Sequence, residues 1–226
     1  MINDKLTPEF YAGLYTGVIQ NIVGHPLDTM KVILQNNKKL KNLKFPELYR
    51  GFSYPLYKLV LTGGMSFDIR SKMKNNGQNN DYLNGAITGA SISPFVHVFD
   101  VFKIKKQNNM KYSIRDFIKP QSILLSVSRE TIGNSVYLGS YFGMRENEIS
   151  PLLAGGIAGC LNWSSTYMID SIKTRYITYD KTIKQCILMG NYWKGFRICM
   201  IRAFLVNSIG FQAYELSLKY IKDFSN

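Results

Sequence analysis

The chain has 226 residues, a formal net charge of +13 and 46% hydrophobic residues. In a soluble protein, this length would give one or two domains and this charge would suggest a nucleic acid or an anionic surface as partner. Three cysteines without metal-ligand spacing and only two histidines disfavour a disulfide framework and a metal site. A nucleic-acid partner is disfavoured because the charges are unevenly placed: three segments contain no Asp, Glu, Lys or Arg, namely 10–27, 82–99 and 149–169.

These charge-free segments run for 18, 18 and 21 residues. Roughly 20 helical residues cross a hydrocarbon core of about 30 Å, so each segment is long enough to span a membrane. Basic clusters such as Lys38–Lys41 and Lys103–Lys106 lie outside them, where they suit anionic lipid headgroups such as those of cardiolipin. The mixed-charge N-terminus shows no cleavable signal peptide. The pattern predicts a membrane protein.

One motif, Gly-x3-Gly-x10-Asp-x2-Lys, occurs three times, with its aspartates 72 and 70 residues apart. An internal repeat dictates the architecture, here one unit of about 70 residues used three times. The repeats cover about 8–74, 81–145 and 151–222 of a single domain, 1–226. Their motif residues are Gly13, Gly17, Asp28 and Lys31; Gly85, Gly89, Asp100 and Lys103; and Gly155, Gly159, Asp170 and Lys173.

Each repeat reads in chain order as a charge-free helix, a basic amphipathic stretch and a second apolar helix. The second helices cover 51–74, 121–145 and 191–222, and they are interrupted by Lys58, by Arg129 with Glu130, and by Arg202. A charge in mid-membrane costs about 3 kcal/mol or more, so it normally faces a polar cavity or a partner. We therefore predict an all-α membrane protein with six transmembrane helices and a short surface helix in each repeat. The glycine pairs let membrane helices approach closely.

The repeats resemble those of the mitochondrial carrier family over essentially the whole chain. That family carries Pro-x-[Asp/Glu]-x2-[Lys/Arg] followed by aromatic-[Lys/Arg]-Gly. The first repeat matches fully, with Pro26 to Lys31 and then Tyr49-Arg50-Gly51. The third has Met168 at the proline position and keeps Trp193-Lys194-Gly195. The second has Val98 at the proline position and Ser122 at the glycine position, with Pro94 one turn earlier.

The resemblance implies a three-fold pseudosymmetric bundle around a central substrate cavity, as in other repeat-built transporters. It implies a matrix-side gate in which the Asp of one repeat pairs with the Lys of the next, formed by Asp28, Lys31, Asp100, Lys103, Asp170 and Lys173. Such a ring is a breakable gate, because buried ion pairs attract strongly but are costly to desolvate. The family places a glutamine beneath each ion pair as a brace, four residues after the lysine. Gln35 and Gln107 occupy these positions in the first and second repeats. Ile177 takes that place in the third repeat.

A second gate on the cytoplasmic side is poorly preserved. With the second helices aligned on their charges, its acidic positions are Ser71, Phe142 and Glu215, and its basic positions are Lys74, Arg145 and Leu218. Only Lys74 and Glu215 can pair around the ring, so we expect a weak gate.

The aligned charges Lys58, Arg129, Glu130 and Arg202 correspond to the family's substrate contact points. An Arg–acid pair at the second point goes with amino-acid-like or carnitine-like solutes in the family, and Met200 to Phe204 with Asn207 resembles that branch. The expected protein is therefore a monomeric transporter of the mitochondrial inner membrane that works by alternating access. It needs no cofactor or metal, binds a small solute and membrane lipids, and is not an enzyme, because no nucleophile–base pair or phosphate loop is present.

Two alternatives stay open. Richness in Asn, Lys, Ile and Tyr is typical of AT-rich genomes such as those of giant viruses or protists, and the compact length fits a viral carrier acting in a host mitochondrion. A viral carrier for nucleotides or deoxynucleotides is one alternative, because a basic cavity suits phosphates. A transport-inactive carrier that serves as a membrane adaptor is the other, favoured by the missing prolines and the poor second gate.

Overall fold

The computed structural model describes residues 8–36, 44–58, 69, 73, 77–179 and 181–225. Within these ranges it describes the backbone, but not the side chains, of 8–14 and of several positions after 210. The described residues are all-helical, and none of them lies in a strand.

Five long helices of 27 to 30 residues dominate the fold: α1 (Pro8–Gln35), α4 (Asp81–Gln107), α6 (Pro120–Glu146), α7 (Pro151–Tyr179) and α9 (Phe196–Ser225). Three short helices follow α1, α4 and α7 in the chain: α2 (Phe45–Leu48), α5 (Ile114–Ile118) and α8 (Ile183–Leu188). Residues 53–58 are also helical, at the start of the second helix predicted for the first repeat. Most of that predicted helix, 59–68 and 70–72 with 74, lies outside the described residues.

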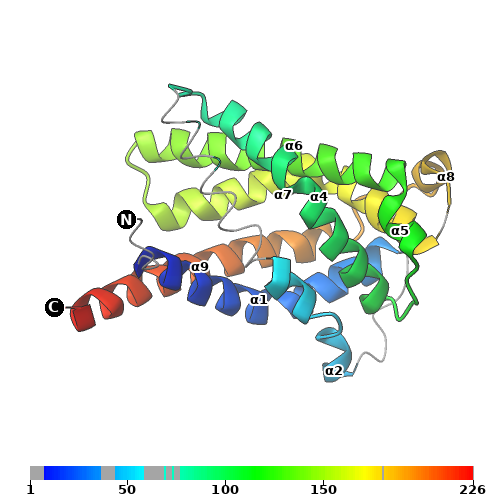
Figure 1. Cartoon of the computed structure of the whole chain (residues 1–226), viewed down its shortest axis with the longest axis horizontal. Helices are drawn as coiled ribbons and strands as arrows, with labels where there is room; N and C mark the ends of the chain where they lie inside the picture. Colours follow the sequence, from blue (N-terminus) through cyan, green and yellow to red (C-terminus); the bar gives the residue numbers. More distant parts are fainter. Residues whose placement is uncertain are drawn as a thin grey trace, which may run out of the picture.

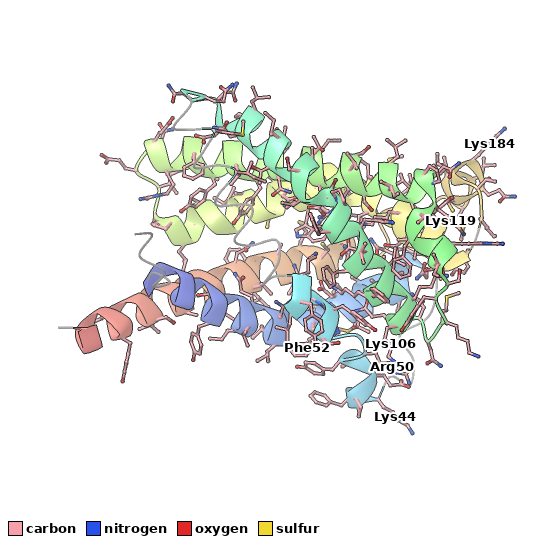
Figure 2. All side chains as sticks on the ribbon, viewed as in Figure 1. Lys44, Arg50, Phe52, Lys106, Lys119 and Lys184 are labelled. Carbon is pink, nitrogen blue, oxygen red and sulfur yellow. The ribbon has the colours of Figure 1, made fainter. Side chains whose placement is uncertain are left out.

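The long helices pack in the order α4, α6, α7, α9 and α1, with weaker contacts among α1, α4 and α7. In Figure 1 the three short helices lie at one end of the bundle, whereas the start of α1, the α6–α7 turn and the end of α9 lie at the other. Figure 2 places the labelled Lys44, Lys119 and Lys184, which lie beside or within the short helices, at the same end. The short helices therefore form a basic rim around the end where α1, α4 and α7 terminate.

Mean hydropathy identifies fewer candidate membrane spans among the described residues than the charge-free segments predict. Among the described residues, α4 is the one helix long and apolar enough to cross a membrane by length and composition. The charge-free part of α7 falls short because polar uncharged residues, including Asn162, Ser164, Ser165 and Thr166, lower its mean hydropathy. The six-span arrangement remains a proposal.

Glycines of the repeated motif lie where helices cross. A Cβ at Gly85 would come within 2.3 Å of Asn134 O, and one at Gly89 within 2.2 Å of Glu130 O. In the third repeat a Cβ at Gly159 would lie 2.1 Å from Asn207 Nδ2. These glycines let α4 approach α6 and let α7 approach α9. Gly17 and Gly155 are also buried, whereas the packing of Gly13 lies outside the described residues.

The repeats differ where the short helix leads into the next long one. Gly51 and Gly195 have φ values of 79° and 83°, in the left-handed region that favours glycine. Ser122, at the corresponding position by alignment, lies inside α6, which already begins at Pro120. The second repeat therefore needs no glycine there, because its helix starts earlier. Pro26 and Pro94 both lie inside helices.

Candidate functional site

The six charged residues of the repeated motif meet near the ends of α1, α4 and α7. Lys103 Nζ lies 2.6 Å from Asp28 Oδ2, and Lys173 Nζ lies 2.5 Å from Asp100 Oδ2. Lys31 Nζ closes the ring at 2.5 Å from Asp170 Oδ2. Each aspartate thus contacts the lysine of the next repeat. Lys173 is the most buried of the three ring lysines, with 1% of its side chain exposed, whereas 18% of its partner Asp100 is exposed.

The two predicted brace glutamines behave differently. Gln35 Nε2 donates to Asp170 Oδ2 at 2.9 Å, so this amide supports the Lys31–Asp170 pair directly. Gln107 Nε2 instead donates to the Thr29 hydroxyl at 2.9 Å, and no described contact joins it to an ion pair of the ring. Thr29 is the residue after Asp28, so the amide of Gln107 is bound to the neighbour of a ring aspartate and not to its carboxylate. The ring therefore has one direct brace among the described residues.

Each ring aspartate also contacts a second cation, contributed by the preceding repeat. Asp28 contacts Arg202 of α9 through Nε, and Asp100 Oδ1 lies 3.4 Å from Lys58 Nζ. In the third repeat, Arg129 Nε of α6 lies 3.8 Å from Asp170 Oδ1. The predicted solute-contact cations thus lie directly against the ring. Two cations share each carboxylate, which offsets the cost of holding it out of water.

Arg129 differs from Lys58 and Arg202 because it also forms an ion pair with an acidic residue of its own helix, Glu130. Its guanidinium Nη1 contacts Glu130 Oε1, while Asn134 Nδ2 lies 3.2 Å from Glu130 Oε2. Glu130 is buried, with 7% of its side chain exposed. Most of the Arg129 charge is therefore neutralised within α6, consistent with its longer distance to Asp170.

These charges line a cavity of about 100 Å³ in the middle of the bundle. Six cations and three carboxylates face it, a formal excess of three positive charges, or two when Glu130 is included. An excess of positive charge favours a ligand that carries an anionic group. The lining residues are Asp28, Lys31, Val32, Lys58, Asp100, Lys103, Ile104, Arg129, Trp163, Asp170, Lys173, Thr174 and Arg202.

Trp163 of α7 is a cavity residue that the sequence analysis did not single out. Lys31 Nζ lies 3.8 Å from the centre of its ring, and Arg129 Cζ lies 4.6 Å from it. Arg202 Cζ lies farther away, at 5.9 Å. Cations from three helices thus lie around one aromatic ring, which attracts them electrostatically. The available signal was position: Trp163 lies two turns before Asp170, on the cavity side of the repeat.

A second group that the sequence analysis missed connects the ring to the short helices. Three residues before each aspartate stand His25, His97 and Tyr167, each at most 2% exposed. His25 Nε2 lies 3.0 Å from Arg50 O, and His97 Nε2 lies 3.2 Å from Phe117 O. The Tyr167 hydroxyl donates to the carbonyl that precedes Gly195 at 2.7 Å. One buried side chain per repeat therefore fixes the ring helix to its short helix, in the second repeat, or to the segment that follows it, in the first and third.

The predicted cytoplasmic-side pair is not described. Lys74 lies outside the described residues, and so does the side chain of Glu215 in α9. Arg145, aligned with Lys74, donates to Ile149 O at 2.8 Å, within the α6–α7 turn. The Lys74–Glu215 pairing stays a prediction.

Known proteins that resemble this chain are mitochondrial carriers and transporters. The family model described as mitochondrial carrier protein matches residues 145–225. The mitochondrial arginine transporter BAC2 of Arabidopsis thaliana is 26% identical, with 93% of this chain and 90% of the relative aligned. Mitochondrial ornithine transporter 1 of Schizosaccharomyces pombe is 24% identical over 92% of this chain and 90% of its own. The human mitochondrial carnitine/acylcarnitine carrier protein is 25% identical over 93% of both.

The family match covers the third repeat, whereas these relatives align over nearly the full length of this chain. Three in-register Asp-x2-Lys motifs, closed into one ring between α1, α4 and α7, give the same assignment independently. The family match and these relatives support membership of the mitochondrial carrier family.

Proposed function

We propose that this protein is a multi-pass transporter of the mitochondrial inner membrane that moves an amino-acid-like or carnitine-like solute by alternating access. The central cavity carries the proposal: its excess of positive charge suits a carboxylate, while Glu130 and the face of Trp163 suit a cationic group. Relatives named as transporters of arginine, ornithine and carnitine support this class of solute, since each of those solutes carries both kinds of group.

Binding is proposed to occur by exchange of partners. The solute carboxylate binds one of the cations that hold the ring aspartates, Lys58, Arg129 or Arg202, and that cation then leaves its aspartate. The cationic group of the solute takes the vacated place over Trp163, next to Glu130. Planar guanidinium forks suit a carboxylate, because they bind it with two parallel hydrogen bonds. A zwitterion such as carnitine leaves the net charge of the cavity unchanged, whereas arginine, ornithine or lysine adds one positive charge.

Partner exchange also explains how a solute would open the ring. With its second cation withdrawn, a ring aspartate keeps only the lysine of the next repeat. A buried carboxylate with a single partner is less well compensated, so the closed ring loses stability when the cavity is occupied. Alternating access follows when the opposite end closes around the same solute. The weak cytoplasmic-side gate inferred from Lys74 and Glu215 would leave that closure dependent on bound solute.

The partners proposed outside the cavity are lipids. Basic side chains lie on the rim formed by the short helices, with Lys44, Lys119 and Lys184 labelled in Figure 2. Exposed apolar side chains, including Ile114 and Leu188, lie on the same short helices. A surface of this kind suits an interface with anionic lipid. We propose that the protein works there as a monomer.

The decisive experiment is uptake into liposomes that contain the purified protein. Labelled L-arginine, L-ornithine, L-lysine, carnitine, ATP, dATP and dTTP would be offered with the same solute or none inside. We expect saturable uptake of a zwitterionic or basic amino acid or of carnitine, and its loss in the Arg202→Ala variant. Uptake of nucleotides alone would replace the proposal with the nucleotide carrier. Failure to transport any solute, by protein that unfolds cooperatively on heating, would support the adaptor.

A further inference from the structure

The ring helices α1, α4 and α7 meet in pairs at their C-terminal parts, and we call these three contacts seams. The seams are held by different numbers of polar contacts. Each seam has one lysine–aspartate pair. The contacts around these pairs are not three-fold symmetric. All residues from 28–36, 100–108 and 170–179 are described, so the seams can be compared directly.

The α1–α7 seam carries the most polar contacts. Gln35 Nε2 donates both to Asp170 Oδ2 and, at 3.3 Å, to Ser171 Oγ. Arg175 Nε donates to Gln35 O at 2.9 Å, at the last residue of α1. The Tyr179 hydroxyl donates to the next carbonyl, that of Asn36. The last turn of α1 is therefore tied to α7 by both side chains and main chain.

Arg175 makes this seam especially difficult to separate. The residue is fully buried, and no described carboxylate pairs with it. Its guanidinium instead donates to main-chain oxygens, including Gly190 O at 2.6 Å and Asn191 O at 3.0 Å besides that of Gln35. A buried guanidinium that lost one acceptor would leave a donor unsatisfied, which is costly. Arg175 thus connects the end of α1 to the short helix of the third repeat.

The α1–α4 seam is intermediate. Besides the Asp28–Lys103 pair, Gln107 donates to Thr29 Oγ1. Asn36 Nδ2 donates to Asn108 Oδ1 at 3.2 Å, at the far end of the same seam. Both contacts are between neutral side chains, and neither involves the main chain of the opposite helix.

The α4–α7 seam has no described polar contact beyond its ion pair between Asp100 and Lys173. Val101 and Ile104 of α4 pack there against Ile177 of α7. Ile177 occupies the brace position that Gln35 fills in the first repeat. Apolar packing is non-directional, so these surfaces can slide or part without breaking a hydrogen bond.

We infer that the ring opens first and widest between α4 and α7, while the ends of α1 and α7 stay latched through Arg175 and Tyr179. The end of α4 then moves relative to a fixed α1–α7 pair, and the solute passes beside Val101 and Ile177. This inference rests on the proposed function only in taking the ring as the gate. Its first test requires no transported solute.

The chain offers a matched set of reporters, one residue after each ring aspartate. Thr29, Val101 and Ser171 are each at most 1% exposed and lie at the α1–α4, α4–α7 and α1–α7 seams, respectively. Each of these residues would be replaced singly by cysteine in a Cys160→Ser, Cys199→Ser background, and each variant would be treated with a water-soluble maleimide in lipid nanodiscs. Cys186, whose pKa burial raises, is an internal reference for a thiol that should not react.

We expect the Val101→Cys variant to react at least about tenfold faster than Ser171→Cys, with Thr29→Cys between them, because a buried thiol reacts only when its seam opens. Equal rates would support symmetric opening and overturn the inference. Fastest reaction at Ser171→Cys would overturn it as well. If none of the three introduced cysteines reacted in nanodiscs although all three reacted fully in denaturant, the inference would be overturned too.

Cross-linking tests the same inference through transport. Paired cysteines at Asn36 and Tyr179 join α1 to α7, and a pair at Ile104 and Ile177 joins α4 to α7. With the best solute from the uptake screen, a short cleavable cross-linker should leave at least half the rate in the first pair. It should remove more than about nine-tenths in the second, with recovery after cleavage, because the opening seam is then closed. Loss in both pairs, or only in the first, contradicts the inference.

If a double-cysteine variant fails to fold, single substitutions with smaller effects on packing give an independent comparison. Tyr179→Phe removes one hydroxyl at the latched seam, so it should lower the Tm while leaving the transport rate within about twofold, because that contact persists through the cycle. Ile177→Gln restores a brace at the opening seam and should slow transport several-fold, with Ile177→Leu as control. A faster rate in Tyr179→Phe, or an unchanged one in Ile177→Gln, would show that the seams are not used as inferred.

Discussion

Lys31 Nζ of α1 lies 3.8 Å above the ring of Trp163 in α7, while the same ammonium group pairs with Asp170 at 2.5 Å. One lysine thus belongs both to the ring of ion pairs and to the set of cations around Trp163. Removing the indole is therefore expected to affect both the closed state and the binding of a cationic group.

For Trp163, we predict that replacement by Leu lowers the specificity constant, kcat/KM, for the preferred cationic or zwitterionic solute. A cation–π contact contributes about 0.5–2 kcal/mol, which corresponds to a decrease of roughly twofold to thirtyfold. Replacement by Phe keeps an aromatic face and should have a smaller effect. Leu161→Val, at a half-exposed position on the same helix, is the control. Equal values for Trp163→Leu and the control would remove Trp163 from the binding site.

For the ring, we predict that Lys173→Ala costs more stability than Lys103→Ala. The Lys173 side chain is 1% exposed and that of Lys103 is 18% exposed, so water reaches the space left by Lys173 less easily. Asp100 would also keep only its 3.4 Å contact with Lys58, whereas Asp28 keeps a closer contact with Arg202. Breaking a buried pair costs about 3–5 kcal/mol, and the cost falls as water gains access. Thermal unfolding in detergent measures the difference. Lys106→Ala, at an exposed position of α4, should leave the Tm nearly unchanged. The reverse order for the two ring lysines would contradict the burial argument.

For helix packing, we predict opposite outcomes for two glycine-to-alanine substitutions. Gly89→Ala would place a methyl group 2.2 Å from Glu130 O, so α4 and α6 must separate or the protein fails to fold. At Gly143 of α6, no described atom outside the neighbouring residues and local helix backbone lies within 4 Å of such a methyl group. Gly143→Ala should raise stability slightly, by about 0.4–1 kcal/mol, because it restricts the unfolded chain. Similar Tm values for the two variants would mean that the α4–α6 crossing is looser than described.

For the opposite gate, Lys74→Glu alone should lower the rate of exchange, because it sets two acids against each other. Adding Glu215→Lys should restore that rate, since the pair is then re-formed with its signs exchanged. Liposome exchange of the preferred solute is the measurement. Unchanged transport in both variants would show that these two residues do not pair.

Sequence periodicity identified much of the ring, because each motif carries its Asp and Lys one helical turn apart on the same face. Three equally spaced copies could form only a few symmetric arrangements. The positions of Gln35, Arg129 and Arg202 followed from the same register. The different partner of Gln107 did not, because Thr29 belongs to another helix and captures the amide only after the ends of α1 and α4 meet.

The sequence by itself determined the three-fold repeat, the helical class and the charges that each repeat brings to the cavity, because these depend on spacing along single helices. Tertiary structure decided which charges share a carboxylate, why Trp163 faces three cations and how unequally the seams are held. Those properties depend on contacts between residues far apart in the chain, including pairs separated by 78 and 140 positions. The hydroxyl of Thr29 and the apolar side chain of Ile177 decide which contacts form there. Local periodicity carries no information about such partners, since they are chosen by packing.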